Sequence, residues 1–156
     1  MTEGLTNTPN FELSDTRDID VVEIQKLRES VEWLPDTPEV WQRTLETALA
    51  VSSVYSEDEL VGIGFLVGSP RHAVLCDLCV NPANQAQGIG TKLVESLVDA
   101  ANNQGIRYVT LTMNEKNADW LEGLYSKNGF QMIGNAMQLV RDENSVPAAM
   151  PNPHGT

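Results

Sequence analysis

The chain has 156 residues, with ten Lys and Arg against 22 Asp and Glu, so its formal net charge is −12. This length predicts one domain, and the negative charge argues against nucleic acid or an anionic membrane as a partner. The acidity is uneven, because residues 1–70 hold fourteen acids and four bases, whereas residues 71–156 hold eight and six. No apolar stretch approaches the length of a membrane-spanning helix and no signal sequence is recognisable, so we expect a cytoplasmic protein.

Apolar periodicity and turn residues divide the chain into helices and strands. Asp18 or Asp20 can cap a first helix and Thr37-Pro38 can begin a second, so two helices follow a short first strand. In chain order the prediction is a strand, two helices, three strands, a helix, a strand, a helix and two strands. The strands are expected at 10–13, 50–55, 60–67, 73–80, 107–113, 130–133 and 136–141, and the last two helices at 88–104 and 118–128.

The two ends of the chain lack this periodicity. Residues 1–9 are small and polar, and we expect them to form a flexible N-terminus. Residues 142–156 are rich in Pro, Asn and Ala, and we expect a disordered tail there. A single domain over residues 10–141 remains.

The strand predicted at 73–80 carries both cysteines, Cys76 and Cys79. Side chains alternate along a strand, so residues three apart should point to opposite faces and the two sulfurs should not meet. No second pair and no nearby His completes a zinc site, so we expect no metal. Two small apolar strand residues are favoured over a redox or metal pair. The alternation predicts one face with Val74, Cys76, Leu78 and Val80, and the other with Leu75, Asp77 and Cys79.

A Gly-containing turn connects this strand to the long amphipathic segment 88–104. Gly88 and Gly90 lack Cβ, so the backbone there can turn tightly and approach a ligand. N–H groups at a helix start have no partner within the helix, and together with the helix dipole they favour an anion such as phosphate. The spacing fits neither a P-loop nor a dinucleotide fingerprint. On these residues alone, a tight connection without a ligand is an equally good interpretation.

Two stretches of the sequence are specific. Val80-Asn-Pro82 followed by Gln85-Ala-Gln-Gly88-Ile-Gly90 resembles the acetyl-CoA loop of the GNAT superfamily of N-acetyltransferases, and Leu124-Tyr125-Ser-Lys-Asn-Gly129-Phe130 resembles the Leu-Tyr-x-x-x-Gly-Phe signature of the same family. The resemblance implies an α/β fold with a mixed, mostly antiparallel, twisted sheet of six to seven strands, about four helices and a central acetyl-CoA site. Homodimers are common in this superfamily, so a homodimer is compatible with the resemblance.

The resemblance also implies the residues that bind acetyl-CoA as cosubstrate. In the family, the strand before the loop splays from the next one, its main chain bonds the pantetheine, and an N–H group polarises the acetyl carbonyl. The implied binding residues are Leu78, Cys79, Val80, Gln85, Ala86, Gln87, Gly88, Ile89, Gly90, Thr91 and Asn117.

Three positions depart from the family pattern. Ala86 replaces a common Gly and Gln87 replaces a usual Arg or Lys, so the backbone donors remain but a cationic contact to the CoA phosphates is missing. Asn117 stands eight residues before Tyr125, whereas the family's Asn stands seven before its Tyr.

Two side chains are candidates for catalysis. When an amine attacks a thioester, the leaving thiolate needs a proton or a hydrogen-bond donor, and the resemblance assigns this role to Tyr125; packing alone is the alternative. The amine must also lose a proton, and Asp77 is the only acid in strand 73–80. A structural carboxylate is the alternative for Asp77, and Trp33 either packs or lines an acceptor pocket.

The predicted function is transfer of the acetyl group of acetyl-CoA, by direct attack, to a primary amine of a small molecule. The acidic first half of the chain favours a cationic acceptor, although solubility explains the same charge. A peptide or protein amine is the second hypothesis, weakened because residues 109–113 lack the Glu that some protein-acetylating relatives carry there. The third is a regulatory module that binds acyl-CoA without turnover.

Overall fold

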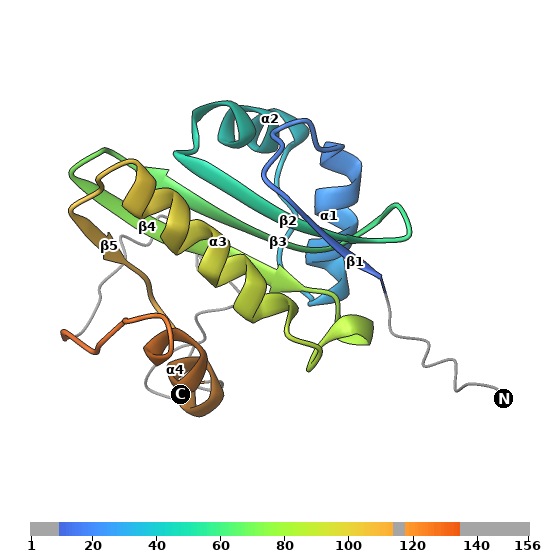
Figure 1. Ribbon diagram of the computed structural model, residues 1–156. Helices are drawn as coiled ribbons and strands as arrows, with labels where there is room; N and C mark the ends of the chain where they lie inside the picture. The colour runs from blue at the N-terminus through green and yellow to red at the C-terminus, as the bar shows by residue number, and fades with distance from the viewer. Residues whose placement is uncertain (1–9, 114–117, 135–156) are drawn as a thin grey trace, which may run out of the picture.

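The computed structural model describes residues 10–113 and 118–134, which form a twisted sheet with helices on both faces (Figure 1). The expected segments 1–9, 136–141 and 142–156, and Asn117, lie outside this part of the chain. The elements are β1 (Phe11–Ser14), α1 (Val21–Ser30), α2 (Pro38–Thr47), β2 (Ala50–Ser56), β3 (Glu59–Gly68), β4 (His72–Val80), the 3-10 turn η1 (Pro82–Asn84), α3 (Ile89–Asn103), β5 (Tyr108–Thr110) and α4 (Ala118–Ser126).

The described strands form one sheet in the order β1-β2-β3-β4-β5. β1 to β4 pair antiparallel, and β5 pairs parallel to β4. The mixed, mostly antiparallel sheet that the sequence predicted is therefore confirmed, with five described strands instead of six to seven. Residues 130–133 are not a strand, so that prediction is wrong, whereas the strand expected at 136–141 lies outside the described residues.

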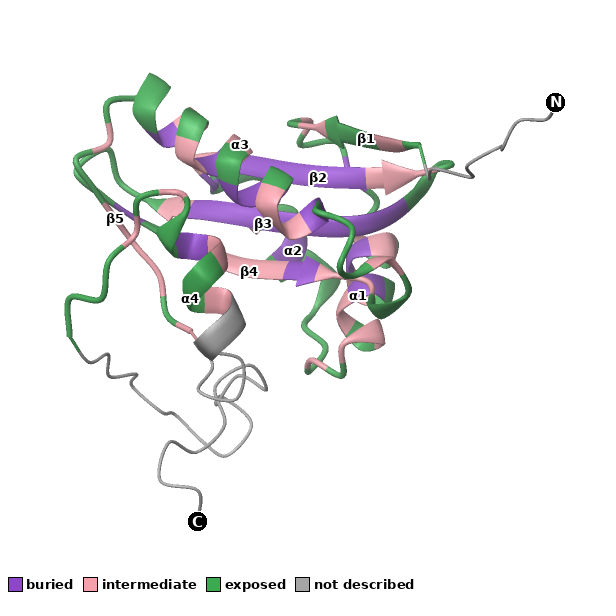
Figure 2. Ribbon diagram, turned by 60° about the horizontal axis from the view of Figure 1, so that its bottom comes forward, coloured by how far each residue is buried: buried purple, intermediate pink, exposed green. Residues whose placement is uncertain are grey.

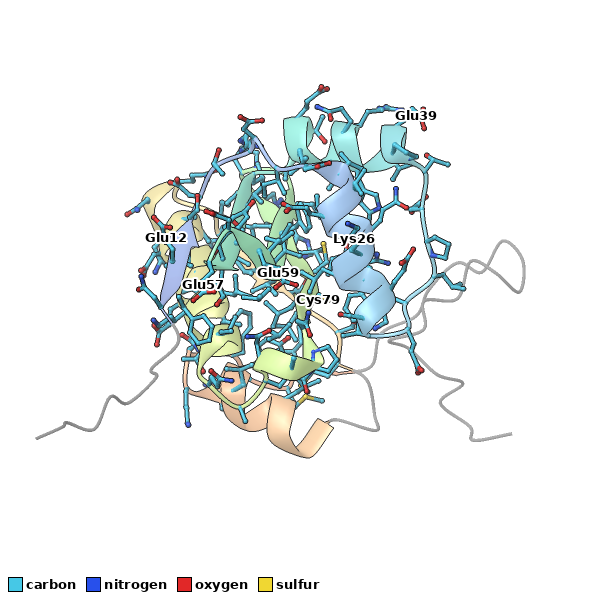
Figure 3. The ribbon with its side chains drawn as sticks, turned by 90° about the vertical axis from the view of Figure 1, so that its right-hand side faces the viewer. Glu12, Lys26, Glu39, Glu57, Glu59 and Cys79 are labelled. Atoms are coloured by element: carbon cyan, nitrogen blue, oxygen red, sulfur yellow. The ribbon has the colours of Figure 1, made fainter. Side chains whose placement is uncertain are left out.

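Helices cover both faces of the sheet. α3 packs on β2, β3 and β4, whereas α1 packs on the opposite face of β3 and β4 and contacts α2. Figure 3 views the molecule with α1 and α3 on either side of the strands. Because β3 is covered on both faces, its residues 60–66 are all buried, and Figure 2 shows β2 and β3 buried over most of their lengths. No helix within residues 10–113 and 118–134 has the length and apolar character needed to cross a membrane.

The helices begin where local signals place them. The Asp20 side chain accepts a hydrogen bond from the N–H of Val22 at 2.9 Å at the start of α1, and Thr37 caps α2, with Pro38 as its first residue. The amphipathic segment predicted at 88–104 forms α3, and most of its apolar face is buried, with Val98 partly buried. The buried residues are Ile89, Leu93, Val94, Leu97 and Ala101.

Glycines in β3 allow α3 to approach the sheet closely. A Cβ added to Gly62 would lie 2.8 Å from Cγ2 of Ile89, and one added to Gly64 would lie 3.0 Å from Cδ1 of Leu78 and 3.1 Å from Cδ1 of Leu97. The start of α3 is thus held against the middle of the sheet, next to the end of β4.

A β-bulge interrupts β4 at Asp77. Ile63 of β3 pairs with Cys79 and Phe65 pairs with Cys76, so two β4 residues stand opposite a single β3 residue between these pairs. Asp77 has a φ of +54°, in the left-handed region. An Asp tolerates this conformation better than most residues, because its short side chain can hydrogen-bond locally.

The bulge changes which face each following residue occupies. Cys76 and Cys79 both pack against the core on the α1 face, whereas Leu78 and Val80 pack on the α3 face. The expectation that the two cysteines point to opposite faces is therefore wrong, as is the grouping of Leu78 and Val80 with Val74 and Cys76. Side chains alternate between the two faces of a strand, so one extra residue at a bulge moves every following side chain to the opposite face.

Candidate active site

β4 extends well beyond the end of its neighbour β5. The parallel pairing covers only His72 to Val74 of β4, and β5 ends at Thr110. From Leu75 to Val80, no strand of the described chain pairs with that edge of β4, and Figure 1 shows the chain after β5 turning away towards α4. Main-chain donors and acceptors on this edge, beside the predicted thioester-binding residues Leu78, Cys79 and Val80, therefore have no strand partner in the described chain.

The two thiols at this strand are held neutral. Cys79 is 2% exposed and its Sγ–H donates to the carbonyl oxygen of Leu27 at 3.7 Å. Burial raises the pKa of Cys79 to about 12, and burial together with the neighbouring Asp77 charge raises the pKa of Cys76 to about 12. Both are free cysteines, so their observed role is packing. Within the described residues, no group of three His, Cys, Asp or Glu is placed to hold a metal ion.

The loop after β4 presents backbone N–H groups without a partner. Gly88 precedes α3 with a φ of +84° and no side chain caps the helix. Lys92 is the first α3 residue whose N–H reaches a carbonyl, that of Gly88 at 3.1 Å. The N–H groups of residues 87–91 accordingly lack a hydrogen-bond acceptor within the described chain, and α3 has no acid in its first turn. This arrangement suits an anion.

The predicted loop residues surround these donors. Gln85 donates from Nε2 to the carbonyl oxygen of Val80 at 3.1 Å, which ties the loop to β4. Ala86 has a φ of +62°, so it adopts the left-handed conformation that the family's common Gly adopts freely, at a cost of about 1–2 kcal/mol. Gln87 is exposed, as are Ala86 and Gly88.

Tyr125 lies in α4 and packs against β4 and α3. It is 6% exposed, shares a core cluster with Leu75 of β4 and Leu97 of α3, and its ring meets Phe130 edge to face at 5.8 Å. Burial raises the pKa of Tyr125 to about 12, so the hydroxyl remains protonated near neutral pH. The preceding residue, Leu124, lies next to the loop, 3.6 Å from a Cβ built on Gly90.

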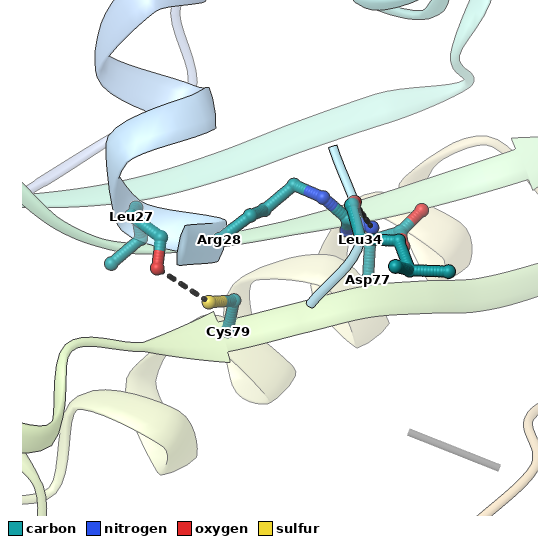
Figure 4. A network of polar contacts seen from close by, with 5 residues as sticks. All are labelled: Leu27, Arg28, Leu34, Asp77 and Cys79. Carbon is teal, nitrogen blue, oxygen red and sulfur yellow. Dashed lines mark hydrogen bonds and ion pairs between the residues drawn. The ribbon is translucent and has the colours of Figure 1, made fainter. Parts of the chain in front are cut away.

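Asp77 is held by a residue that the sequence did not single out. Its Oδ1 accepts a hydrogen bond from Nη1 of Arg28 at 3.0 Å (Figure 4), and Arg28 lies in the last turn of α1. The Arg28 guanidinium lies 4.9 Å from the ring centroid of Trp33 and 4.8 Å from that of Trp41. Arg28 and Asp77 are separated by 49 positions in the sequence, so no local signal indicates this pair.

The sequence matches the family model of the acetyltransferase (GNAT) domain over residues 48–132, more than half of the chain. The chain belongs to the GNAT acetyltransferase family. The match includes β4, the loop and α4, so the two motifs that carried the resemblance lie within it, and the family expected from them is confirmed.

Similar proteins extend this finding to the fold. An uncharacterized, ycf52-like N-acetyltransferase of Prochlorococcus marinus is 26% identical over 106 residues, which cover 65% of this GNAT chain and 59% of that relative. The structure of a protein from meticillin-resistant Staphylococcus aureus, named as a probable acetyltransferase, has a TM-score of 0.72 at 23% identity, covering 84% of this chain and 99% of that one. A GNAT family acetyltransferase from Streptococcus pneumoniae has a TM-score of 0.69 at 23% identity, covering 85% and 100%.

Proposed function

We propose that this GNAT chain transfers the acetyl group of acetyl-CoA directly to the primary amine of a small, cationic molecule. The observation that carries the proposal is the edge of β4 from Leu75 to Val80, which has no strand partner within residues 10–113 and 118–134. This edge leads directly into a loop whose N–H groups have no acceptor among the same residues. A strand edge can hydrogen-bond an extended pantetheine arm, and the loop can hold the pyrophosphate at its end.

The loop binds through its backbone. With Gln87 in place of a basic residue, phosphate binding depends on the N–H groups of residues 87–91 and on the dipole of α3. On β4, a main-chain N–H of Leu78, Cys79 or Val80 polarises the acetyl carbonyl as negative charge develops on its oxygen. Because Cys79 is buried and its thiol neutral, we assign no covalent acyl transfer to it.

The chemical step is a direct displacement. The amine nitrogen attacks the carbonyl carbon, the carbon–sulfur bond breaks, and the electron pair of that bond remains on sulfur. Tyr125 donates from its hydroxyl to the departing thiolate, and its pKa of about 12 suits it to a strong hydrogen bond more than to early proton release. Asp77 accepts the proton that the amine loses and later releases it to solvent, and the departing thiolate, hydrogen-bonded by Tyr125, takes up one proton from solvent. The products are an N-substituted acetamide and the free thiol of CoA.

The acids of the first half of the chain support a cationic acceptor. Burial raises the pKa of Tyr55 in β2, and the charges of Glu23, Asp18 and Asp20 raise it further, so negative potential surrounds the start of α1. Figure 3 looks onto the end of the sheet where Glu12 of β1 and Glu57 and Glu59 near the β2–β3 turn lie. Such a field attracts cations and repels anions.

A panel of matched amines tests the proposal. Butylamine, 1,4-diaminobutane and 4-aminobutyrate each carry a primary amine on a four-carbon chain and differ in the group at the far end, which is uncharged, cationic or anionic. Rates are compared per amine group, because the diamine carries two. We expect thiol release from acetyl-CoA to be fastest with the diamine and slowest with the amino acid, and we expect added salt to reduce this difference. Equal rates with all three reject the cationic acceptor.

Two further measurements separate the alternatives. Acetylation of peptide N-termini or lysines with all small amines inert assigns the chain to protein acetylation instead. Calorimetric binding of acetyl-CoA without thiol release for any amine or peptide assigns it to a binding module.

Tyr125→Phe tests the chemistry, and we expect it to lower kcat by about 10²-fold or more while acetyl-CoA affinity stays within about twofold.

A further inference from the structure

We propose that Arg28 is a positioning residue for the acceptor amine, because it fixes the Asp77 carboxylate beside the open edge of β4. This inference rests on the proposed function, in which Asp77 meets the amine. It extends that function to α1 and to the connection between α1 and α2, neither of which carries a residue of the acetyl-CoA motifs.

The contacts of Arg28 leave its guanidinium little freedom. Nη1 donates to Oδ1 of Asp77 at 3.0 Å and Nη2 donates to the carbonyl oxygen of Leu34 at 3.5 Å (Figure 4). The indole rings of Trp33 and Trp41 lie 4.9 and 4.8 Å from the guanidinium carbon, and such contacts fix the plane of the group. Arg28 therefore links α1, the α1–α2 connection and α2 to β4.

Asp77 is more exposed than its partner Arg28, and this difference matters for binding of the amine. The Arg28 side chain is 14% exposed, whereas that of Asp77 is 37% exposed. Nε of Arg28 and Nε1 of Trp41 are buried without a hydrogen-bond acceptor among the described residues, so the cluster is closed towards the core. An approaching molecule thus meets more of the carboxylate than of the guanidinium.

The bulge in β4 gives the carboxylate its unusual position. A regular strand residue points straight out of a face, but Asp77 has a φ of +54° and lies in a segment where two residues oppose one. The strained backbone aims the side chain, and Arg28 holds the end of it. Asp77 directly precedes Leu78, the first of the proposed thioester-binding residues, so the segment that carries the carboxylate adjoins the proposed thioester site.

The alternative is that Arg28 only neutralises Asp77, and the two roles predict opposite results. If Arg28 only neutralised the carboxylate, its removal would leave a free negative charge and improve binding of a cationic amine. If Arg28 positions the carboxylate, its removal lets Asp77 move, and the kcat/KM for the amine falls. In the proposed site the loop and the main chain of residues 78–80 hold acetyl-CoA, so its affinity distinguishes a local effect on the amine from general damage.

The experiment compares wild type, Arg28→Met, Arg28→Lys, Asp77→Asn and the double variant Arg28→Met/Asp77→Asn, with Arg43→Met as the matched control. Arg43 is an exposed base on α2 without an ion pair to Asp77, so its removal changes the net charge equally. Steady-state kinetics with the best amine of the panel give kcat/KM, and calorimetry gives the acetyl-CoA affinity of each variant without turnover.

We expect Arg28→Met to lower kcat/KM for the amine about tenfold or more, with acetyl-CoA affinity within about twofold of wild type. Arg28→Lys keeps the charge but loses the planar stack, so we expect an intermediate loss, and Arg43→Met should stay within about twofold. Because Arg28 acts through Asp77, the double variant should be no slower than Asp77→Asn alone.

Each of the following results overturns the inference. An unchanged or improved kcat/KM in Arg28→Met rejects positioning, and so does an equal loss of acetyl-CoA affinity. If Arg28→Met does not fold, Arg28→Lys and Trp33→Phe replace it in the experiment. A kcat/KM equal to wild type in both of these variants rejects the positioning role of Arg28. A wild-type protein that acetylates no amine rejects the proposed function and this inference together, whereas an active wild type with unaffected Arg28 variants rejects the inference alone.

Discussion

Gln85 ties the loop to the strand before it, since its Nε2 donates to the carbonyl oxygen of Val80 at 3.1 Å. Two residues later, Gln87 has an exposed side chain without any such contact in the described structure. The loop thus contains two glutamines. The side chain of Gln85 hydrogen-bonds to β4, and that of Gln87 is exposed.

This pair gives a direct test of backbone binding. We expect Gln85→Ala to raise the KM for acetyl-CoA about three- to tenfold, because the loop loses the hydrogen bond that fixes its N–H groups. Gln87→Ala is the matched control and should change that KM by less than about twofold. Equal effects of the two substitutions would contradict the bracing role of Gln85.

Gly88 and Gly105 provide a second matched pair at the two ends of α3. Both are left-handed, with φ values of +84° and +68°, and a Cβ at either would have no atom within 4 Å. Valine at either position should therefore destabilise the fold by a similar amount, about 1–2 kcal/mol or more, through backbone strain and not through a clash. Only Gly88→Val should also raise the KM for acetyl-CoA strongly, as measured by thiol release alongside urea unfolding. A similar rise in Gly105→Val would remove the loop from the cosubstrate site.

The glycines under α3 give a prediction about stability. A Cβ at Gly62 would lie 2.8 Å from Cγ2 of Ile89 and 3.2 Å from Cδ1 of Leu93, so α3 must shift to accept it. We expect Gly62→Ala to lower the free energy of unfolding by about 1–3 kcal/mol. The control is Gly123→Ala in α4, where a Cβ meets nothing within 4 Å and helix propensity favours Ala. An unchanged free energy of unfolding for Gly62→Ala, measured by urea titration, would show that α3 does not need this close approach.

The sequence predicted features that depend on neighbours along the chain. The cap of α1, the apolar face of α3 and the Gly-bearing start of that helix are local, and each was placed within a few residues. The order of elements up to α4 followed from the same kind of signal, and the two motifs identified the family.

The features that the sequence could not predict depend on contacts between distant segments. The bulge at Asp77 arises where β4 meets Gly64 of β3, and it moved Cys79 to the face that the alternation had assigned to Cys76. Arg28 looked like an ordinary basic residue in the last turn of a helix, because only the folded chain brings it to Asp77.

Alkaline pH tests the burial of the groups around β4 and α4. Burial raises the pKa of Cys79 from 9.0 and that of Tyr125 from 10.0, each to about 12. As pH rises, the unfolded chain loses these protons first, so the stability that each group contributes is complete below its unfolded pKa and is lost towards pH 12.

The free energy of unfolding should accordingly fall above pH 9, with a slope of at most about 1.4 kcal/mol per pH unit for each group. The pH range in which each group loses its contribution begins at its unfolded pKa, which is 9.0 for Cys79 and 10.0 for Tyr125. Removing one group or the other should therefore change the slope at different pH values. Cys79→Ala should reduce the slope of the unfolding free energy against pH between pH 9 and 10, where Cys76 still contributes to it. Tyr125→Phe should leave the slope between pH 9 and 10 unchanged and reduce it only above pH 10. Urea titrations at half-unit steps from pH 8 to 11 measure both slopes. A Tyr125→Phe curve parallel to wild type above pH 10 would show that the hydroxyl is not held protonated by burial, and would leave the thiolate without its proposed donor.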